Sequence, residues 1–328
     1  MFYVAKQGVY QLKMVGGSEP IEKALRSNQL TPTMRKKLEL VVDVRQFALD
    51  YLHLVAHKNY KDINLDWHEV IHTVSASDSL AFKPYQWWFP IIGYVPYKGF
   101  FDLADAKKEE AKLKTLGFET QNRPISGYST LGFFPDPLWP SMLELSDFSL
   151  IELIIHELTH ATVYIPNQTS FNETLANFVG TFGARSYIHN RYHDNGKTLA
   201  KFDTYQHQLG LYREFFYNLY QKMDTIFQSN DSDEIKLLNK QKVLQHAEKE
   251  FLDLPIHDDF KKIDWSTINN ATMLSFKRYN YDDKIFLDLL NALQGNFELF
   301  LQEVNYYGRA DDAFLSLKNR LRELQGQT

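Results

Sequence analysis

Length, composition and charge place this chain among ordinary globular proteins and exclude several other classes. Its 328 residues are 44% hydrophobic and 23% charged, with a formal net charge of −5, which allows a large core and offers no basic tract for nucleic acid. Cysteine is absent, so disulfide bonds are excluded, and no run of about 20 apolar residues predicts a membrane-spanning helix.

The first 60 residues are predicted to be mainly helical. Between Arg35 and His57 the apolar residues recur at the spacing of one amphipathic helix. The residues expected on its apolar side are Leu38, Val41, Val42, Phe47, Leu52 and Leu54.

Residues 65–135 are predicted to mix strands with one helix. β-Forming residues predict strands at Trp67–Ser75, Trp87–Tyr97 and Phe118–Phe134. A helix is expected over Asp102–Leu116, closed by Gly117, because glycine readily takes the left-handed conformation that ends helices.

The first of these strands contains His68-Glu69-Val70-Ile71-His72, a match to the zinc-hydrolase pattern H-E-x-x-H. Four residues along a strand span about 13 Å. Two imidazoles so far apart cannot share a zinc ion whose Zn–N bonds are about 2.0–2.1 Å. We therefore expect that His68 and His72 do not form a metal site.

Residues 138–325 are predicted to be almost entirely helical, with a polar connection at Ser229–Glu234. Together these regions predict the α+β class, with a strand-containing N-terminal lobe, an active-site helix and a helical C-terminal lobe. We expect a helical N-terminus and mixed lobe over residues 1–145, and one continuous catalytic unit over 146–328. This layout suits a zincin.

The second match to the pattern, His156-Glu157-Leu158-Thr159-His160, lies on a predicted buried helix. Ser149-x-x-Glu152 has the form of a capping box, and Pro166 is expected to stop the helix. The residues that repeat at helical spacing are Ile151, Ile154, Ile155, Leu158, Ala161, Thr162 and Ile165. Two histidines and a glutamate are costly to bury on such a helix unless they are paired or bind a metal.

Residues four apart on a helix share one face, so His156 and His160 can bind one ion, with Glu157 as general base. Catalytic zinc takes three protein ligands, and Glu173 is the candidate for the third. Alternatively, the two histidines are core residues bonded to carbonyls, and Glu173 belongs to a capping box, Ser170-x-x-Glu173, that starts the next helix.

Two further sets of polar residues lie near this motif in the sequence. Asn177 follows Glu173 by one turn and is expected either to orient a ligand or to be an ordinary polar helix residue. His189 and His193 lie at helical spacing without a glutamate between them, which is typical of a solvated helix end.

At this point the sequence resembles a mostly bacterial family described as putative zinc aminopeptidases. The resemblance extends from near the N-terminus to about Phe300. The segments that carry it are His156–His160, Asn172–Asn177, Tyr97–Phe101, Gly127–Gly132, Asn269–Ala271 and Tyr279. With Glu173 as a ligand, the site is similar to that of a gluzincin.

The resemblance implies one Zn²⁺ per chain and a peptide substrate, from which single N-terminal residues are hydrolysed by a zinc-activated water. Tyr279 is the candidate donor to the oxyanion, with core packing as its alternative. The residues Tyr128, Ser129 and Thr130 are expected on a strand that either binds the extended peptide or is an ordinary sheet strand.

Two other functions stay open at this point. One is a zinc endopeptidase, because exopeptidase activity rests on the resemblance alone. The other is a non-catalytic zinc protein that binds a peptide or partner, which would have no need of Glu157. The family also implies a bacterial cell-envelope location with a lipidated cysteine, whereas this sequence has neither a cysteine nor the layout of a signal peptide after Met1.

Overall fold

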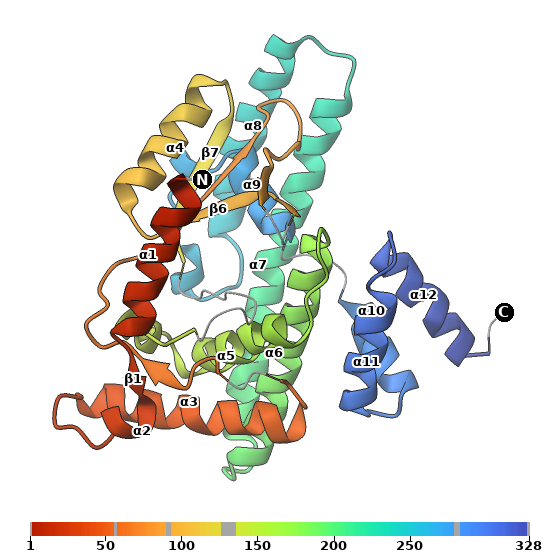
Figure 1. Cartoon of the computed structure of the whole chain (residues 1–328). Coiled ribbons are helices and arrows are strands. Elements are labelled where there is room, and N and C mark those ends of the chain that lie inside the picture. Colours follow the sequence, from red (N-terminus) through yellow and green to blue (C-terminus); the bar gives the residue numbers. More distant parts are fainter. Residues whose placement is uncertain (1, 56–57, 90–92, 126–135, 279–282, 327–328) are drawn as a thin grey trace. The chain divides into compact units, whose positions relative to one another are not determined.

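The computed structural model of the chain describes residues 2–55, 58–89, 93–125, 136–278 and 283–326 (Figure 1). Most of these residues are helical and the strands form small sheets, so the fold is mixed α+β, as predicted. The α-helices are α1 (Phe2–Gly16), α2 (Ile21–Ala24), α3 (Pro32–Tyr51), α4 (Leu103–Thr115), α5 (Asp147–Thr162), α6 (Thr169–Arg191), α7 (Lys197–Gln228), α8 (Asp233–Leu252), α9 (Asn270–Arg278), α10 (Lys284–Ala292), α11 (Phe297–Tyr307) and α12 (Ala313–Leu324). The strands are β1 (Glu19–Pro20), β2 (Asp62–Ile63), β3 (His72–Ser77), β4 (Trp87–Phe89), β5 (Gly93–Val95), β6 (Tyr97–Phe100) and β7 (Glu119–Pro124), and the 3-10 helices are η1 (Pro140–Glu144), η2 (Asp258–Lys261) and η3 (Trp265–Thr267).

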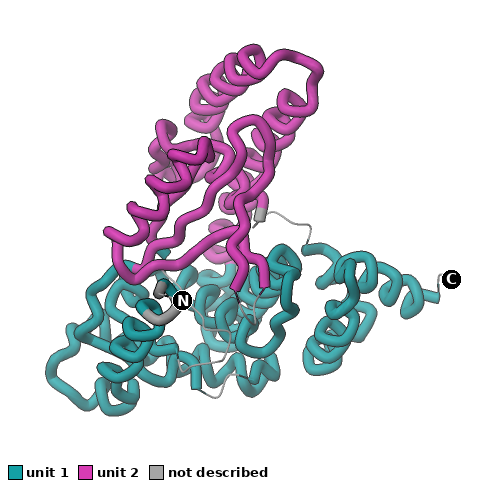
Figure 2. Tube along the Cα trace, turned by 45° about the horizontal axis from the view of Figure 1, so that its top comes forward, with its two compact units in different colours: residues 1–70, 125–199, 282–328 teal, residues 71–124, 200–281 magenta. Residues whose placement is uncertain are grey.

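The chain forms two compact units from interleaved segments (Figure 2). Unit 1 comprises residues 1–70, 125–199 and 282–328, and unit 2 comprises residues 71–124 and 200–281. The predicted functional division after residue 145 and the zincin-like character of the fold stay predictions.

Helix α3 supplies one wall of the core of unit 1. It begins at Thr31, whose hydroxyl oxygen accepts a hydrogen bond from the Met34 N–H at 3.2 Å. The predicted continuation to His57 is wrong, because His53 takes a positive φ of 51° and turns the chain out of the helix. Val42 is 37% exposed instead of buried, and the buried residues of the helix are Leu38, Val41, Val44, Phe47 and Ala48.

Helix α5 begins one turn earlier than predicted. The Ser146 side chain accepts a hydrogen bond from the Ser149 N–H at 3.1 Å, so Ser149 lies inside the helix and the predicted capping box is wrong. The Glu152 carboxylate instead accepts a hydrogen bond at 3.0 Å from the Thr181 hydroxyl of α6. The helix also ends at Thr162, earlier than expected from Pro166, because Val163 is extended.

Helices α5 and α6 approach closely because α6 carries glycines where they meet. A Cβ atom at Gly180 would lie 3.2 Å from the Glu152 carbonyl oxygen and 3.4 Å from the His156 Cβ. A Cβ atom at Gly183 would lie only 2.7 Å from the Leu52 Cδ1 and 3.0 Å from the Ile155 Cγ2. The absence of side chains at these two positions therefore lets α6 lie against α5 and the end of α3.

The other side of α6 packs against the C-terminal helices of unit 1 through aromatic rings. The Phe171 ring lies 5.5 Å from that of Phe286 in α10 and 5.2 Å from that of Phe314 in α12. Phe178 lies 5.7 Å from Phe300 in α11. Helix α6 is thus held on both sides, which limits how far its polar residues can move.

Unit 2 contains a three-stranded antiparallel sheet in the order β6-β3-β7. Its predicted helix is confirmed as α4, which begins after the capping residue Asp102 and is followed by Gly117 at φ +86°. The predicted strand at Trp67–Ser75 begins only at His72, and the one at Trp87–Tyr97 divides into β4, β5 and the start of β6. The predicted strand at 118–134 is β7 as far as Pro124, and most of its remainder lies outside the described residues.

The helical part of unit 2 has its own core. Phe216 and Met223 of α7, Phe251 of α8 and Met273 of α9 are fully buried in one cluster. The polar connection predicted after α7 is confirmed, because Ser232 caps the start of α8.

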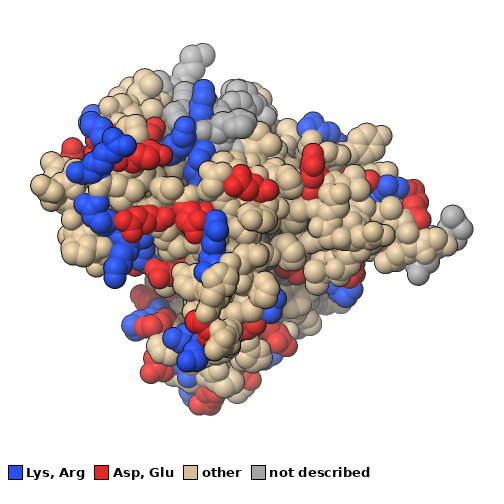
Figure 3. All heavy atoms as spheres, turned by 90° about the horizontal axis from the view of Figure 1, so that it is seen from below, with Lys and Arg blue, Asp and Glu red and all other residues tan. Residues whose placement is uncertain are grey.

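Surface properties agree with the composition. In the described part of the chain, no helix combines the length and apolar character needed to cross a membrane. On the face drawn in Figure 3, Lys and Arg side chains are interspersed with Asp and Glu side chains, which agrees with the absence of a basic tract in the sequence.

The close approach of helix α6 to Leu52 and Ile155 at Gly183 gives a prediction for the stability of the protein. Gly183→Val should lower the free energy of unfolding by about 1–3 kcal/mol, because the added carbons overlap Leu52 and Ile155. Gly210→Val is the matched control: Gly210 is an exposed residue within α7, no atom lies within 4 Å of its Cβ position, and valine has the better helix propensity. Urea unfolding followed by circular dichroism should separate the two, and equal effects would show that the close approach contributes nothing.

Candidate metal centre

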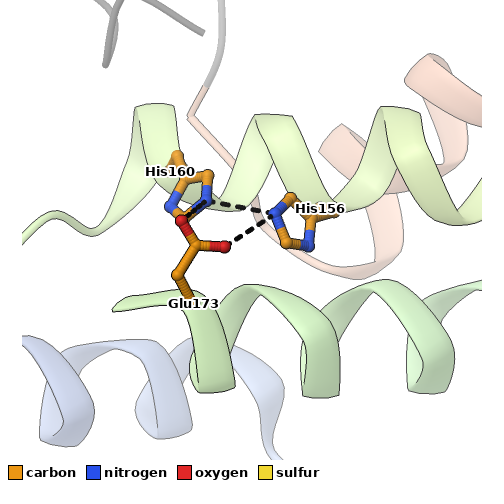
Figure 4. Close-up of side chains that lie close together, drawn as sticks. All are labelled: His156, His160 and Glu173. Carbon is orange, nitrogen blue, oxygen red and sulfur yellow. Dashed lines mark hydrogen bonds and ion pairs between the residues drawn. The ribbon is translucent and has the colours of Figure 1, made fainter. Parts of the chain in front are cut away.

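Three side chains predicted from the sequence converge between α5 and α6. His156 and His160 lie one turn apart on α5, and Glu173 reaches toward both from α6 (Figure 4). The Nε2 atoms of the two histidines are 3.1 Å apart. The Glu173 oxygens lie 3.7 Å from the His156 Nε2 and 3.9 Å from the His160 Nε2.

These distances leave room for an ion among the three groups. Separations of 3.7 and 3.9 Å are too long for hydrogen bonds. Two nitrogen ligands about 2.0–2.1 Å from a tetrahedral zinc ion are themselves about 3.3 Å apart, close to the separation of the two Nε2 atoms. Among the described residues, this is the one group of three or more His, Cys, Asp or Glu side chains placed to hold a metal ion.

The protonation of His160 suits a metal ligand. Its side chain is buried, and burial lowers the pKa of the imidazole to about 4, so the ring is neutral at neutral pH. A neutral imidazole offers a nitrogen lone pair to a cation. The other nitrogen, Nδ1, is buried and has no hydrogen-bond partner among the residues that the structure describes.

Glu157 lies near the same three side chains, and burial shifts its pKa in the opposite direction, upward. Burial raises the pKa of its carboxyl to about 8, and the negative charges of Glu173 and Asp136 add to the increase. The two carboxyl groups, Glu157 and Glu173, are therefore near enough to repel each other. A cation held by the three side chains would oppose that repulsion.

Asn172 attaches α6 to the loop after α5. Its amide donates to the Ile165 carbonyl at 2.7 Å and accepts from the Ile165 N–H at 2.9 Å, so one buried side chain satisfies both backbone groups. Because Glu173 is the next residue, this pair of bonds also locates the start of α6 relative to the histidines. The predicted capping box at Ser170 is wrong, because α6 begins after Gln168, and Glu173 lies beyond the first turn, where it faces α5.

The other sequence-predicted residues lie apart from this group. His68 and His72 are not on a helix, and the His72 Nδ1 lies 3.1 Å from the Asn122 Oδ1; that they form no metal site stays a prediction. His189 and His193 are exposed near the end of α6, as expected. Within the described part of the chain, the buried Nδ2 of Asn177 has no hydrogen-bond partner, and the orienting role of Asn177 stays a prediction.

Four predicted residues lie outside the described residues: Tyr279, Tyr128, Ser129 and Thr130. The Asn269–Ala271 segment, to which Tyr279 was assigned by resemblance, is described and belongs to unit 2. There the Asn269 amide donates to the Thr120 carbonyl at 2.9 Å, and the Asn270 N–H donates to the Glu119 carboxylate at 2.7 Å. These bonds attach the start of α9 to β7.

Sequence reasoning missed three residues whose charges or pKa values couple to the site. Tyr60 is fully buried, and its pKa is raised by burial and then by the charges of Glu157 and Asp136. The pKa of Tyr164, just after α5, is raised by burial and then by the charge of Glu173. Tyr60 and Asp136 are distant from the motif in the sequence, so no local pattern linked them to the site. Tyr164 lies a few residues past His160, and only this short separation could have indicated that it lies near the site.

One comparison with known proteins identifies the family. Residues 2–314 match the family described as putative aminopeptidase, and because the match covers nearly all of the chain, the protein belongs to that family. The family description points to peptide hydrolysis. Neither a curated protein nor a solved structure matches the chain.

The Asn172 contact gives a second prediction. Asn172→Ala should lower the free energy of unfolding by about 1–3 kcal/mol, because it leaves the buried N–H and carbonyl of Ile165 without partners. Asn190→Ala on the same helix is the matched control, since Asn190 is exposed and makes one bond at 2.8 Å to the Ser186 carbonyl. Denaturant unfolding of both variants checks this, and an unaffected Asn172 variant would contradict the proposed link between α6 and the loop.

Proposed function

We propose that the protein is a zinc-dependent aminopeptidase with a gluzincin-type site. His156, His160 and Glu173 bind the zinc ion, and Glu157 is the general base. The observation that carries the proposal is the convergence of two imidazole nitrogens and one carboxylate in a buried place. This is the set of ligand types used by catalytic zinc sites that keep one position open.

A bound zinc ion supplies Lewis-acid chemistry: it polarises a carbonyl and lowers the pKa of water. Glu157 accepts the proton from the attacking water and passes it to the departing amine. Without an ion, burial raises the pKa of this carboxyl to about 8, and the positive charge of a bound zinc ion would lower that pKa, so that the ionised carboxylate could accept a proton and later release it. Neighbouring Glu173 serves as a ligand and not as the base.

The restriction to N-terminal residues rests on membership of the family. The ligand types of the candidate site support the proposal of zinc-dependent peptide hydrolysis, and they would serve an endopeptidase equally well. The substrate comparison below therefore tests the restriction separately from the zinc chemistry.

The first test concerns the metal. Purified protein should hold close to one zinc ion per chain, and His160→Ala should lose it, because two remaining ligands bind zinc weakly. His68→Ala is the control within the chain and should keep its zinc, since His68 belongs to the non-helical H-E-x-x-H match at residues 68–72. Metal analysis of folded protein measures both, and full zinc retention by the His160 variant would disprove the assignment.

The second test concerns catalysis. Glu157→Gln keeps the size of the side chain and removes the base, so zinc content and fold should persist while turnover falls by about 10²-fold or more. The substrates should be matched peptides with free and with acetylated N-termini. Hydrolysis of the free-amine peptide alone supports the aminopeptidase, and hydrolysis of both points to an endopeptidase. A zinc-loaded wild type that cleaves neither would contradict the proposed activity.

A further inference from the structure

The turn between α6 and α7 contains the chain's one asparagine that is followed by glycine, Asn195-Gly196. Asn195 and Gly196 take φ values of 58° and 79°, and the Lys197 N–H donates to the Asp194 carbonyl at 3.4 Å. Positive φ at two successive central residues is typical of a type I′ turn, which favours the pair Asn-Gly. Both residues are exposed to solvent.

Asp194 and Thr198 hold the base of this turn and leave its tip unoccupied. The Asp194 carboxylate accepts hydrogen bonds from the Thr198 N–H at 3.0 Å and from the Thr198 hydroxyl at 2.5 Å. Within the described part of the chain, neither the Asn195 side-chain amide nor the Gly196 N–H has a hydrogen-bond partner. No atom lies within 4 Å of the position that a Cβ atom at Gly196 would take. No neighbouring group therefore occupies or shields the Gly196 nitrogen.

Two other exposed asparagines outside the helices differ from Asn195 in this respect. After Asn167, the next backbone N–H donates to the Ile165 carbonyl at 3.3 Å. After Asn230, the next backbone N–H donates to the Ser229 Oγ at 3.3 Å. In both cases the following residue also carries a side chain, whereas glycine has none and leaves its nitrogen open to attack the neighbouring side chain.

We propose that Asn195 is a site of spontaneous deamidation and conversion to isoaspartate. The Gly196 nitrogen attacks the side-chain carbonyl carbon of Asn195, so that a new C–N bond closes a succinimide ring. The bond from that carbon to the side-chain amino group breaks, and the proton of the Gly196 N–H leaves with the ammonia that is released. Water then opens the ring at either carbonyl and yields aspartate or isoaspartate. Water is the only co-reactant, so the reaction is independent of the metal centre.

The position of the turn determines what the conversion changes in the protein. The turn joins α6, which carries Glu173, to the start of α7. Both products add a negative charge just before α7, where the helix dipole favours an anion. Isoaspartate also adds one carbon atom to the main chain, because the chain then runs through the former side chain. The conversion therefore changes the surface charge and the path of the main chain between the two helices.

Incubation of the full chain in mildly alkaline buffer tests the proposal. Ion-exchange chromatography should show a growing species with one added negative charge, and mass spectrometry of peptides should place the change at Asn195. The rate should rise about tenfold for each pH unit, because the attacking nitrogen must lose its proton and lies far below its pKa. Peptides that contain Asn167 or Asn230 are the controls within the chain and should stay unchanged. Asn195→Gln should abolish the acidic species, because its longer side chain would have to close a larger ring.

The identity of the products tests the cyclic route. Labelling by an isoaspartate-specific methyltransferase should appear in the aged wild type and be absent from the Asn195→Asp variant, whose peptide also serves as the standard for the aspartate product. Direct hydrolysis of the side chain would yield aspartate alone. Aspartate as the only product, an unchanged Asn195, or equal deamidation at Asn167 and Asn230 would overturn the proposal.

Discussion

The close contact between α5 and α6 is the constraint on which the candidate site depends. Two histidines from one helix and a glutamate from the other meet only if the helix axes come close together. Gly180 and Gly183 allow this approach, because a Cβ atom at either position would press on α5. Asn172 then attaches the start of α6 to the loop after α5 through two hydrogen bonds. Loss of either feature would move Glu173 away from the histidines.

The electrostatics of this contact supports the proposal that a cation binds there. Burial holds His160 neutral and, together with the nearby carboxylates, drives Glu157 toward its protonated form. Such a group of buried polar side chains is costly when it stands alone. A positive ion at the centre would satisfy the histidine nitrogens and Glu173 together and would favour the ionised form of Glu157. The same ion that stabilises the helix pair would thus prepare the base for chemistry.

In unit 2, acidic side chains that face inward are held by hydrogen bonds and ion pairs. Glu109 and Glu110 of α4 are turned inward, where they bond to Trp87, Lys98, Thr120, Asn122 and Lys114. Holding the acids inside leaves lysines as the most exposed charges of the helix. The same bond to Trp87 anchors the hairpin formed by β4 and β5, whose outer face carries Trp88 and Tyr94.

The sequence by itself determined the features that depend on local geometry. Residues four apart on a helix share a face whatever surrounds them, so His156 and His160 were predictable as a pair. The bounds of α4 were predictable from Asp102 and Gly117, because capping depends on a few adjacent residues. The H-E-x-x-H match at residues 68–72 was distinguished from the one at residues 156–160 by its β-forming neighbours.

Only the tertiary structure decided which residues occupy the N-cap positions of α5 and α6 and which residues from distant segments lie near Glu157. Ser149 and Ser170 have the local form of caps, yet the N-cap positions belong to Ser146, whose side chain accepts a hydrogen bond from the Ser149 N–H, and to Gln168, which makes no side-chain cap bond. Tyr60 and Asp136 reach the surroundings of Glu157 from segments far from the motif, and no local pattern encodes that proximity. The sequence specified the ligand types and their spacing along one helix, whereas packing against a second helix brought Glu173 to them.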